Sequence, residues 1–394
     1  MPLDSQIGNT KEIRPLVIAA PVRDVVGNLT ELRSGVDLDG KRQDIWFRSD
    51  LPPGAVADGV EPFLSVCLLP AMRVGRPLRI DAPVSPVFMD HQRRIQQHFK
   101  FWDPALQIVE IQAPLRKLEE VPHGRQVATF FSGGVDSFYT TLTHRSQIDD
   151  LIFVQGFDIS LENSQLFKTA YERFLRVAGT LEKTLVRVET NLRTFTDALA
   201  DWAIYQHGPA LGAVAQWLAP HYRQVFIPGE NFPDEPAAWL RGSQPLTDPL
   251  FSTERVAVVH DGYQPTRTRK IEAIIGEPCV RESLRVCWEN PGGAYNCGHC
   301  SKCLRNMAAI RACGWLDQCV TFPPELDLEA LARLPLHLGE WRTLIKEVLE
   351  RVARDRKDPA LAQALRRCLA QHRRRLWQAR WAWGLDRLRR YWRV

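Results

Sequence analysis

The sequence predicts an α/β protein built around a parallel sheet, with an α+β domain before it and a helical extension after it. From about residue 123, short apolar runs alternate with helix-length segments, a pattern typical of a parallel sheet covered by helices on both faces. Before that point apolar runs are separated by Pro and Gly, and after about residue 325 the patterns are mainly helical. We therefore expect an N-terminal α+β domain over 1–122, an α/β domain over 123–325 and a helical extension over 326–394.

The N-terminal part contains apolar runs that predict three strands: PLVIAAPV at 15–22, FLSVCLLPAM at 63–72 and PLRIDAPV at 77–84. The stretch from Met89 to Trp102 has apolar residues at helical spacing among charges and predicts a helix. No group of residues in this part has a spacing typical of a catalytic site, so the sequence assigns it no role.

The central part contains four predicted strands: VATFF at 127–131, LIFVQGF at 151–157, TLVRVE at 184–189 and QVFIPG at 224–229. Predicted helices separate them, from about 138, over 163–179 and over 195–219. Ligands of such sheets bind at the carboxyl ends of the strands. The turn after the first strand is therefore the first place to look for a site.

The length and composition of the chain are those of a globular protein. The 394 residues fit two or three domains of roughly 150 residues, and 45 % hydrophobic with 25 % charged residues is ordinary for a globular protein. No apolar run reaches the roughly 18–20 residues of a membrane span, and the polar start MPLDSQIGNTKEIR has no signal-peptide core. We expect a cytoplasmic protein without a membrane span.

The turn after VATFF is rich in glycine and reads Ser132-Gly133-Gly134-Val135-Asp136-Ser137. Adjacent glycines let backbone N–H groups approach a ligand closely, and the following helix points its positive end at the same place. The two serines can donate hydroxyl hydrogen bonds, and Asp136 can hold a magnesium ion that bridges phosphates. The six residues therefore predict a phosphate site. They lack the Lys of the GxxxxGK[ST] nucleotide loop.

Four of the nine cysteines have the spacing C-x9-C-x2-C-x2-C: Cys287, Cys297, Cys300 and Cys303. In a reducing compartment this spacing predicts a metal site rather than disulfides. Four thiolates complete a tetrahedral shell around Zn²⁺, and Gly298 eases the tight turn. His299 is an alternative ligand, and an iron–sulfur cluster is the competing metal group because C-x2-C-x2-C resembles part of a ferredoxin motif. We favour structural zinc held by the four cysteines.

The SGGVDS turn between a strand and a helix resembles the signature of the PP-loop ATP pyrophosphatase superfamily, which has a HUP-like (adenine nucleotide alpha hydrolase-like) fold. Its members cleave ATP between the α and β phosphates. Together with CW…CGHCSKCLRNMAAIRACG, the turn resembles the 7-cyano-7-deazaguanine synthase family, which carries the same loop and a four-cysteine structural zinc. The resemblance covers about 125–315, roughly half of the chain.

This resemblance implies an ATP-dependent carbon–nitrogen ligase that forms AMP and pyrophosphate. A carboxylate or amide oxygen would attack the α phosphorus, and a nitrogen nucleophile would then displace AMP. It implies that the loop 132–137 binds ATP and Mg²⁺, with Asp136 and Ser137 in catalytic roles. Arg267 and Lys270 are the nearest equivalents of the family's phosphate-binding lysine. Phe157 and Asp158, after the second strand, lie where superfamily members bind adenine, and the alternative for Asp158 is a helix N-cap.

Two departures limit what the resemblance implies. The chain adds about 120 residues before the matching region and about 70 after it, and the stretch from Pro228 to Asp234 does not match the family's Asp- and Tyr-rich substrate segment. No glutaminase arrangement is visible, so ammonia would be free or delivered by a partner. The resemblance therefore supports the adenylation chemistry but does not identify the acceptor. The sequence leaves open whether the acceptor is a small molecule or a macromolecule.

Two other functions compete with the ligase. The first is a PP-loop enzyme that modifies a nucleic-acid or tRNA base, against which the nearest cysteines in sequence, Cys67 and Cys279, lie far from the loop. The second is a non-catalytic subunit that uses the nucleotide site as a switch. A non-catalytic subunit would be expected to have a degenerate site. Asp136 and the two loop serines are all present, which argues against this alternative.

The C-terminal segment is strongly basic. Residues 365–394 hold ten Arg and one acid, Asp386, so the first 364 residues carry a net charge of −4 within the total of +5. At helical spacing one face carries large apolar residues: Trp377, Trp381, Leu385, Leu388 and Trp392. This face predicts packing on the body of the protein, and the alternatives are nucleic acid or an anionic membrane surface as partner. A homodimer is one of the oligomeric states that the sequence allows.

Overall fold

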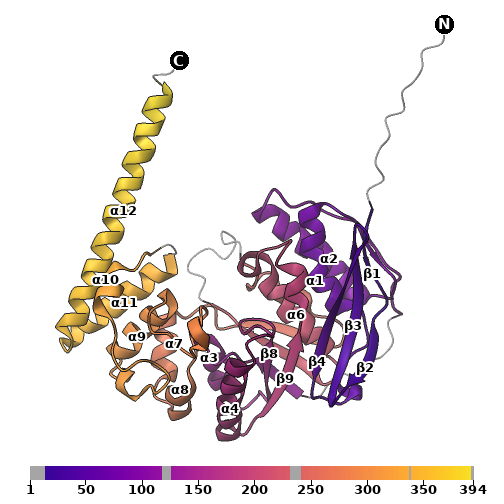
Figure 1. The fold of residues 1–394 in the computed structure, drawn as a ribbon, viewed down its shortest axis with the longest axis horizontal. Coiled ribbons are helices and arrows are strands. Elements are labelled where there is room, and N and C mark those ends of the chain that lie inside the picture. The colour runs from indigo at the N-terminus through magenta and orange to yellow at the C-terminus, as the bar shows by residue number, and fades with distance from the viewer. Residues whose placement is uncertain (1–13, 118–125, 231–240, 337–338, 392–394) are drawn as a thin grey trace. The chain divides into compact units, whose positions relative to one another are not determined.

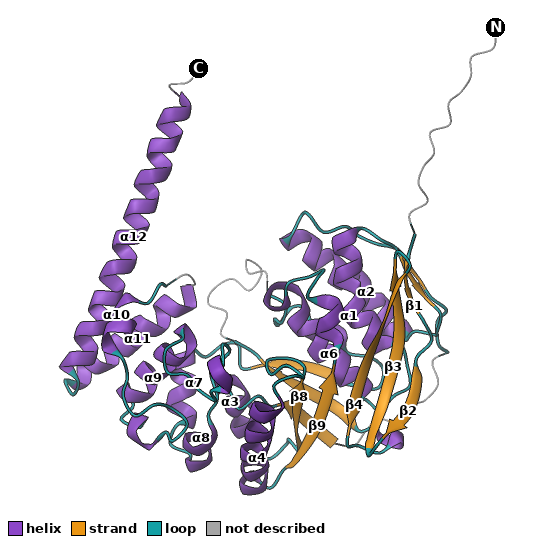
Figure 2. Ribbon diagram, in the orientation of Figure 1, coloured by secondary structure: helices purple, strands orange, loops and turns teal. Residues whose placement is uncertain are grey.

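The computed structural model describes residues 14–117, 126–230, 241–336 and 339–391 (Figure 1). For 339, 340, 376 and 378–391 only the backbone is described. The protein is α/β and has a mixed sheet (Figure 2). It divides into a first unit, formed by Met1–Val127, Arg187–Ile227 and Ala237–Val259, and a second unit, formed by Ala128–Val186, Pro228–Pro236 and His260–Val394.

The first unit contains these strands: β1 Leu16–Ile18, β2 Val22–Val26, β3 Leu29–Leu38, β4 Lys41–Ser49, β5 Leu78–Ile80, β6 Ile111–Gln112 and most of β10 Tyr222–Pro228. Strands β3 and β4 form a long antiparallel hairpin, and β2 and β1 pair antiparallel with β3. On its other side β1 pairs parallel with β5, and β5 pairs parallel with β6. Residues 188–190 of β9, which is Thr184–Thr190, pair antiparallel with β4, with Phe47 opposite Thr190.

Helices pack beside these strands in the first unit: η1 Pro53–Ala55, α1 Glu61–Val74, α2 Pro86–Trp102, α5 Leu192–Thr196, η2 Trp202–Gln206, α6 His207–Trp217 and η4 Asp248–Phe251. Helices α1 and α6 pack on one another. Their contact continues into the sheet, because the Phe47 ring lies 5.6 Å from Phe63 and 5.9 Å from Trp217 between centroids. All three side chains are fully buried, which places the core of this unit here.

The strands of the second unit include a parallel pair. Strands β7 Gln126–Phe130 and β8 Asp150–Gln155 pair parallel, with Ala128 opposite Asp150, and β8 is followed along the sheet by β9 Thr184–Thr190. Strand β11 is Ala257–Asp261. The helices of this unit are α3 Val135–Thr143, α4 Ser164–Leu181, α7 Arg267–Ile274, α8 Pro278–Ser283, η5 Pro291–Gly293, α9 Ser301–Ala312, η6 Leu316–Gln318, α10 Leu328–Arg333, α11 Gly339–Asp355 and α12 Pro359–Tyr391.

Most predicted elements of the central part are confirmed, and one element of the N-terminal part is wrong. The helix expected from Met89 to Trp102 is α2, and the four strands expected after residue 123 are β7, β8, β9 and β10. The expected strand at 63–72 is instead helix α1. Every residue from Glu61 to Met72 is buried, so this helix is apolar on all sides and its periodicity does not separate it from a buried strand.

The sheet is mixed and not purely parallel, because the β2–β3–β4 strands and the β4–β9 pair are antiparallel. The expected domain boundary near 122 lies outside the described residues. Within those residues, no helix combines the length and the apolar composition that crossing a membrane requires.

Candidate functional site

The SGGVDS loop, Ser132–Ser137, connects β7 to α3 in the second unit. Its Gly133 has a left-handed backbone with φ of 70°, and a Cβ at this position would collide with the Phe174 ring. Glycine is therefore required both by backbone conformation and by close packing. The Gly133 carbonyl accepts a hydrogen bond from the backbone N–H of Arg285 (2.8 Å), which ties the loop to a distant segment of the chain.

Helix α3 begins directly at the loop, and no side chain of the described residues caps its N-terminus. The first N–H groups of an α-helix have no partner within the helix, and with the helix dipole they favour an anion. The Gly134 carbonyl accepts hydrogen bonds from the Phe138 N–H (3.0 Å) and from Ser137 Oγ (3.0 Å). The Ser137 hydroxyl is thus buried and used within the loop, whereas Ser132 is partly exposed.

Two cations converge on Asp136, which lies in the first turn of α3. Lys270 Nζ lies 2.6 Å from Asp136 Oδ1, and Arg267 Nη2 lies 2.9 Å from Oδ2. Arg267 Nη2 is also 3.7 Å from Glu230 Oε1. The two cations balance the two carboxylates. Three residues predicted as catalytic, which lie far apart in the sequence, are therefore in direct contact.

Both cations come from α7. Its N-cap residue is Thr266, whose hydroxyl accepts a hydrogen bond from the Arg269 N–H (3.4 Å). Positions 267 and 270 share a face of the helix because they are three residues apart, and α7 packs on α3. Lys270 is fully buried, and its Nζ also donates to the Gly229 carbonyl (2.6 Å), directly after β10. The end of β10 and the helices α3 and α7 thus meet at the Lys270 ammonium.

A second polar group lies further along α3 and was not predicted. Asp261, the last residue of β11, accepts a hydrogen bond from Thr140 Oγ1 (2.7 Å) and lies 3.0 Å from His144 Nε2. Asp136, Thr140 and His144 follow one another at intervals of four, which places them on one face of the helix. This spacing is the signal that would have identified the polar face.

Phe157 and Asp158 follow β8, the strand next to β7. Phe157 is buried and Asp158 is exposed. The alternative role of Asp158 as a helix N-cap is wrong, because α4 is capped by Asn163, whose side chain accepts from the Leu166 N–H (3.3 Å). A contact of either residue with adenine stays a prediction.

The four predicted cysteines lie together, with all four Sγ atoms within 4.8 Å of one another. Cys287 Sγ is 4.0 Å from Cys300 Sγ, and Cys297 Sγ is 3.8 Å from Cys303 Sγ. Zn–S bonds of about 2.3 Å in a tetrahedron place sulfur atoms about 3.8 Å apart, so the group fits a metal ion such as zinc. All four are free cysteines. His299 is exposed and, among the described residues, is not part of the group.

Hydrogen bonds among the sulfurs lower the pKa of one thiol and raise the pKa of two others. The pKa of the Cys287 thiol is lowered because its sulfur accepts hydrogen bonds from Cys300 and Cys303. The same contact with Cys287 raises the pKa of Cys300 to about 11. Backbone N–H groups also point at sulfur atoms, among them those of Cys300 and Asn290 at 3.3 Å from Cys297 Sγ and Cys287 Sγ respectively. These backbone N–H groups can stabilise the thiolate form of the sulfurs that binds a cation.

The turn that carries Cys297 and Cys300 depends on Gly298. Its φ is 78°, and a Cβ there would lie 2.6 Å from Pro323 Cγ. Helix α9 begins directly after Cys300 and places Cys303 in its first turn. A glycine turn followed by a helix thus brings three of the four sulfurs together.

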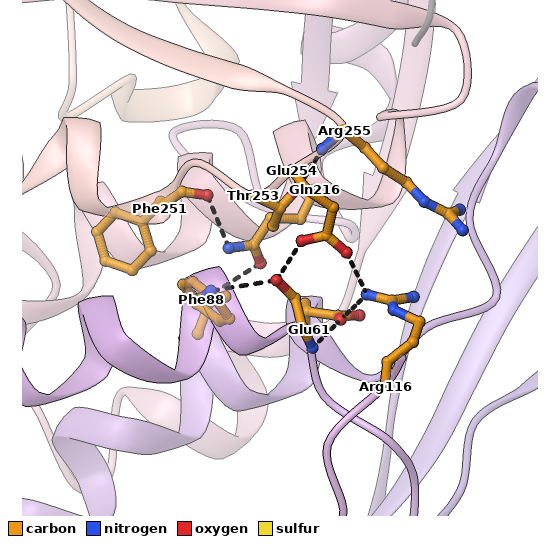
Figure 3. Close-up of polar contacts among 10 residues, drawn as sticks. Glu61, Phe88, Arg116, Gln216, Phe251, Thr253, Glu254 and Arg255 are labelled. Atoms are coloured by element: carbon orange, nitrogen blue, oxygen red, sulfur yellow. Dashed lines mark hydrogen bonds and ion pairs between the residues drawn. The ribbon is translucent and has the colours of Figure 1, made fainter. Parts of the chain in front are cut away.

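A third polar cluster lies in the first unit (Figure 3). Glu61, at the start of α1, accepts hydrogen bonds from Arg116 and from the Ser85 N–H (2.9 Å). Arg116 Nη2 is also 3.4 Å from Glu254 Oε1, and Glu254 accepts a hydrogen bond from the Ser85 hydroxyl. Ser85 caps α2 by accepting from the Phe88 N–H (3.1 Å). The cluster therefore joins the starts of α1 and α2 to the segment before β11.

Comparisons with protein-family models, with curated proteins and with solved structures found no match.

Proposed function

We propose that the protein is an ATP-dependent adenylating enzyme of the PP-loop ATP pyrophosphatase type, similar to the 7-cyano-7-deazaguanine synthase family. It would form AMP and pyrophosphate while activating a carboxylate or amide oxygen for attack by a nitrogen nucleophile. The observation that carries the proposal is the meeting of an uncapped helix N-terminus with Asp136, Arg267 and Lys270 at a glycine-rich loop.

These residues fit a magnesium-bound triphosphate. The N–H groups at the start of α3 would bind phosphate oxygens, and Asp136 would hold Mg²⁺. When bound, ATP supplies an electrophilic α phosphorus, and Mg²⁺ neutralises part of the phosphate charge. The Arg267 guanidinium and the Lys270 ammonium would stabilise the charge of the departing pyrophosphate. A carboxylate substrate needs no general base because it is already ionised near pH 7.

The cysteine cluster would hold zinc in a structural role. All four of its coordination positions are protein thiolates, so no position is left for a substrate or for water. We therefore assign the chemistry to the SGGVDS loop. The metal in the cysteine cluster would stabilise the fold around this loop.

A nucleic-acid base is the second candidate acceptor, and helix α12 favours it. Leu365, Cys368 and Leu369 are buried where α12 packs on α10 and α11, but the Arg side chains at 373–375 are exposed. Trp377 is 61 % exposed, so the expectation that it packs on the body is wrong. The other members of the predicted apolar face lie outside the residues whose side chains are described. Arginine and tryptophan exposed together suit phosphate contact and base stacking.

Product analysis tests the proposal. Purified protein would be incubated with labelled ATP, Mg²⁺ and size-fractionated cell extract, alongside the Asp136→Asn variant. Asp317→Asn, which changes an exposed acid of the same unit, is the matched control. We expect AMP and pyrophosphate from the wild type and the control but not from Asp136→Asn. The size of the stimulating fraction would separate a small acceptor from RNA. ADP with phosphate would refute adenylation, and nucleotide binding without turnover would favour the switch subunit.

A further inference from the structure

The segment Leu284–Cys287 lies between the SGGVDS loop and the cysteine cluster and contacts both. The Arg285 N–H donates to the Gly133 carbonyl in the loop (2.8 Å). Two residues later the chain supplies the first cysteine of the cluster. The residue that holds the loop, Arg285, thus lies only two residues from the first predicted metal ligand, Cys287.

Asn296 holds this segment against the other half of the cluster. Its Oδ1 accepts hydrogen bonds from the Val286 N–H (2.8 Å) and the Cys287 N–H (3.1 Å). Its Nδ2 donates to the carbonyls of Leu284 (2.9 Å) and Thr321 (3.1 Å). The side chain is 8 % exposed, and all of its strong hydrogen-bonding capacity is used.

Neither aspartate nor alanine can make these four contacts. Aspartate would lose both donors, and alanine would remove the Asn296 partner of three backbone groups, while the Leu284 carbonyl would keep its hydrogen bond from the Thr321 hydroxyl (2.8 Å). Asn296 immediately precedes Cys297, so the same residue fixes the cysteine turn and the 284–287 segment. Asn296 is therefore a positioning residue between the two sites.

We infer that metal in the cysteine cluster sets the conformation of the SGGVDS loop through Asn296 and residues 284–287. Without a cation, only weak contacts between sulfur atoms 3.8 to 4.0 Å apart hold the four cysteines together, and Cys287 loses its coordination to the metal. The Arg285 N–H then no longer holds the Gly133 carbonyl, and the left-handed backbone of Gly133 is free to change. Nucleotide affinity at the loop consequently depends on the metal. This last consequence rests on the proposed function.

Hydrogen exchange of the full-length protein tests the conformational part directly. Zinc-loaded, chelator-stripped and zinc-restored samples would be compared, with α2 peptides from 86–102 in the first unit as the internal reference. We expect stripping to raise exchange at 131–137 well above any change in α2, and zinc to reverse it. An increase at the cluster alone, or an equal increase in α2, would overturn the inference. This readout does not require that the loop binds ATP.

Variants test the role of Asn296. Asn306→Ala is the matched control, because Asn306 is also a buried asparagine of this region but bonds within its own helix, to the Lys302 carbonyl (2.7 Å). Zinc-loaded Asn296→Ala should weaken binding of a non-hydrolysable ATP analogue about tenfold, and Asn306→Ala should not. Asn296→Asp, which keeps the acceptor, gives the same test if the alanine variant does not fold.

The two proposals fail in different ways. If the zinc-loaded wild type does not bind the analogue while loop exchange depends on zinc, the proposed function is wrong and the coupling stands. If the wild type binds the analogue equally well with and without zinc, and Asn296→Ala binds like the wild type, the coupling is wrong and the proposed function stands.

Discussion

Replacing Lys270 with methionine removes the most deeply buried cation of the site while keeping its apolar stem. The wild-type Nζ makes two contacts of 2.6 Å, to Asp136 Oδ1 and to the Gly229 carbonyl. Removing one partner of a buried ion pair costs about 3–5 kcal/mol. Asp136 keeps Arg267 at 2.9 Å and retains 17 % side-chain exposure, which lowers the cost. We therefore expect Lys270→Met to reduce the free energy of unfolding by about 2–3 kcal/mol.

The same contacts predict how three single variants rank by their loss in free energy of unfolding. Asp136→Ala leaves a fully buried ammonium without its carboxylate and should cost at least as much as Lys270→Met. Arg267 is 22 % exposed, so Arg267→Gln should cost clearly less. The double variant Asp136→Ala/Lys270→Met removes both buried charges, and it should be about 2 kcal/mol more stable than the sum of the single effects predicts.

Urea unfolding followed by circular dichroism at pH 7 measures these differences. Lys168→Met, at an exposed position on α4, is the control and should change stability little. A Lys270→Met variant as stable as this control, together with additive effects in the double variant, would refute the reasoning. The series also shows whether loss of activity in an Asp136 variant reflects chemistry or unfolding.

Three further predictions follow from other parts of the structure. Gly133→Ala should be strongly destabilising, because φ is 70° and a Cβ would collide with an aromatic ring, whereas Gly134→Ala, with φ of −80°, should be much milder in the same urea assay. Burial raises the pKa of Glu61 above its ordinary value of 4.5. The folded chain therefore binds this proton more tightly than the unfolded chain, so stability should fall as the pH rises from 4.5 to the folded-state pKa and then level off. Glu61→Gln should remove that slope in urea midpoints measured across the range. Replacing the three arginines at 373–375 with glutamine should weaken binding to fluorescent RNA and reduce its dependence on salt, while anionic vesicles serve as the competing ligand; equal RNA binding would contradict a role of α12 in contacting phosphates.

The central strands and α2 were predictable because their local patterns agree with the fold. The runs at 127–131 and 151–157 are short, apolar and bounded by turn residues, and they form β7 and β8. Helix α1 was not predictable in this way, since burial on all sides removes the polar face that marks a helix. The one internal sign against a strand, Pro70, is also unusual inside a helix.

The candidate site was predictable in its residues and not in its contacts. The Gly-rich turn and the cysteine spacing are local, and a short sequence carries each of them. The pairing of Asp136 with Arg267 and Lys270 depends on how α7 packs on α3, which no local pattern encodes. Asn296 was missed for the same reason, because its four bonds join segments before and after the cysteine turn.

The charge balance at the loop bears on how the proposed reaction would begin. Arg267 and Lys270 are both paired with Asp136 in this structure, so a polyphosphate alone would have to compete with this carboxylate for the two cations. A divalent cation held by Asp136 would balance its charge, which would leave Arg267 and Lys270 available for phosphate oxygens. Lys270 would keep the Gly229 carbonyl as an acceptor. In the proposed enzyme, the pairing of Asp136 with Arg267 and Lys270 is therefore the arrangement before substrate binds. It keeps the two cations beside the place where pyrophosphate would leave.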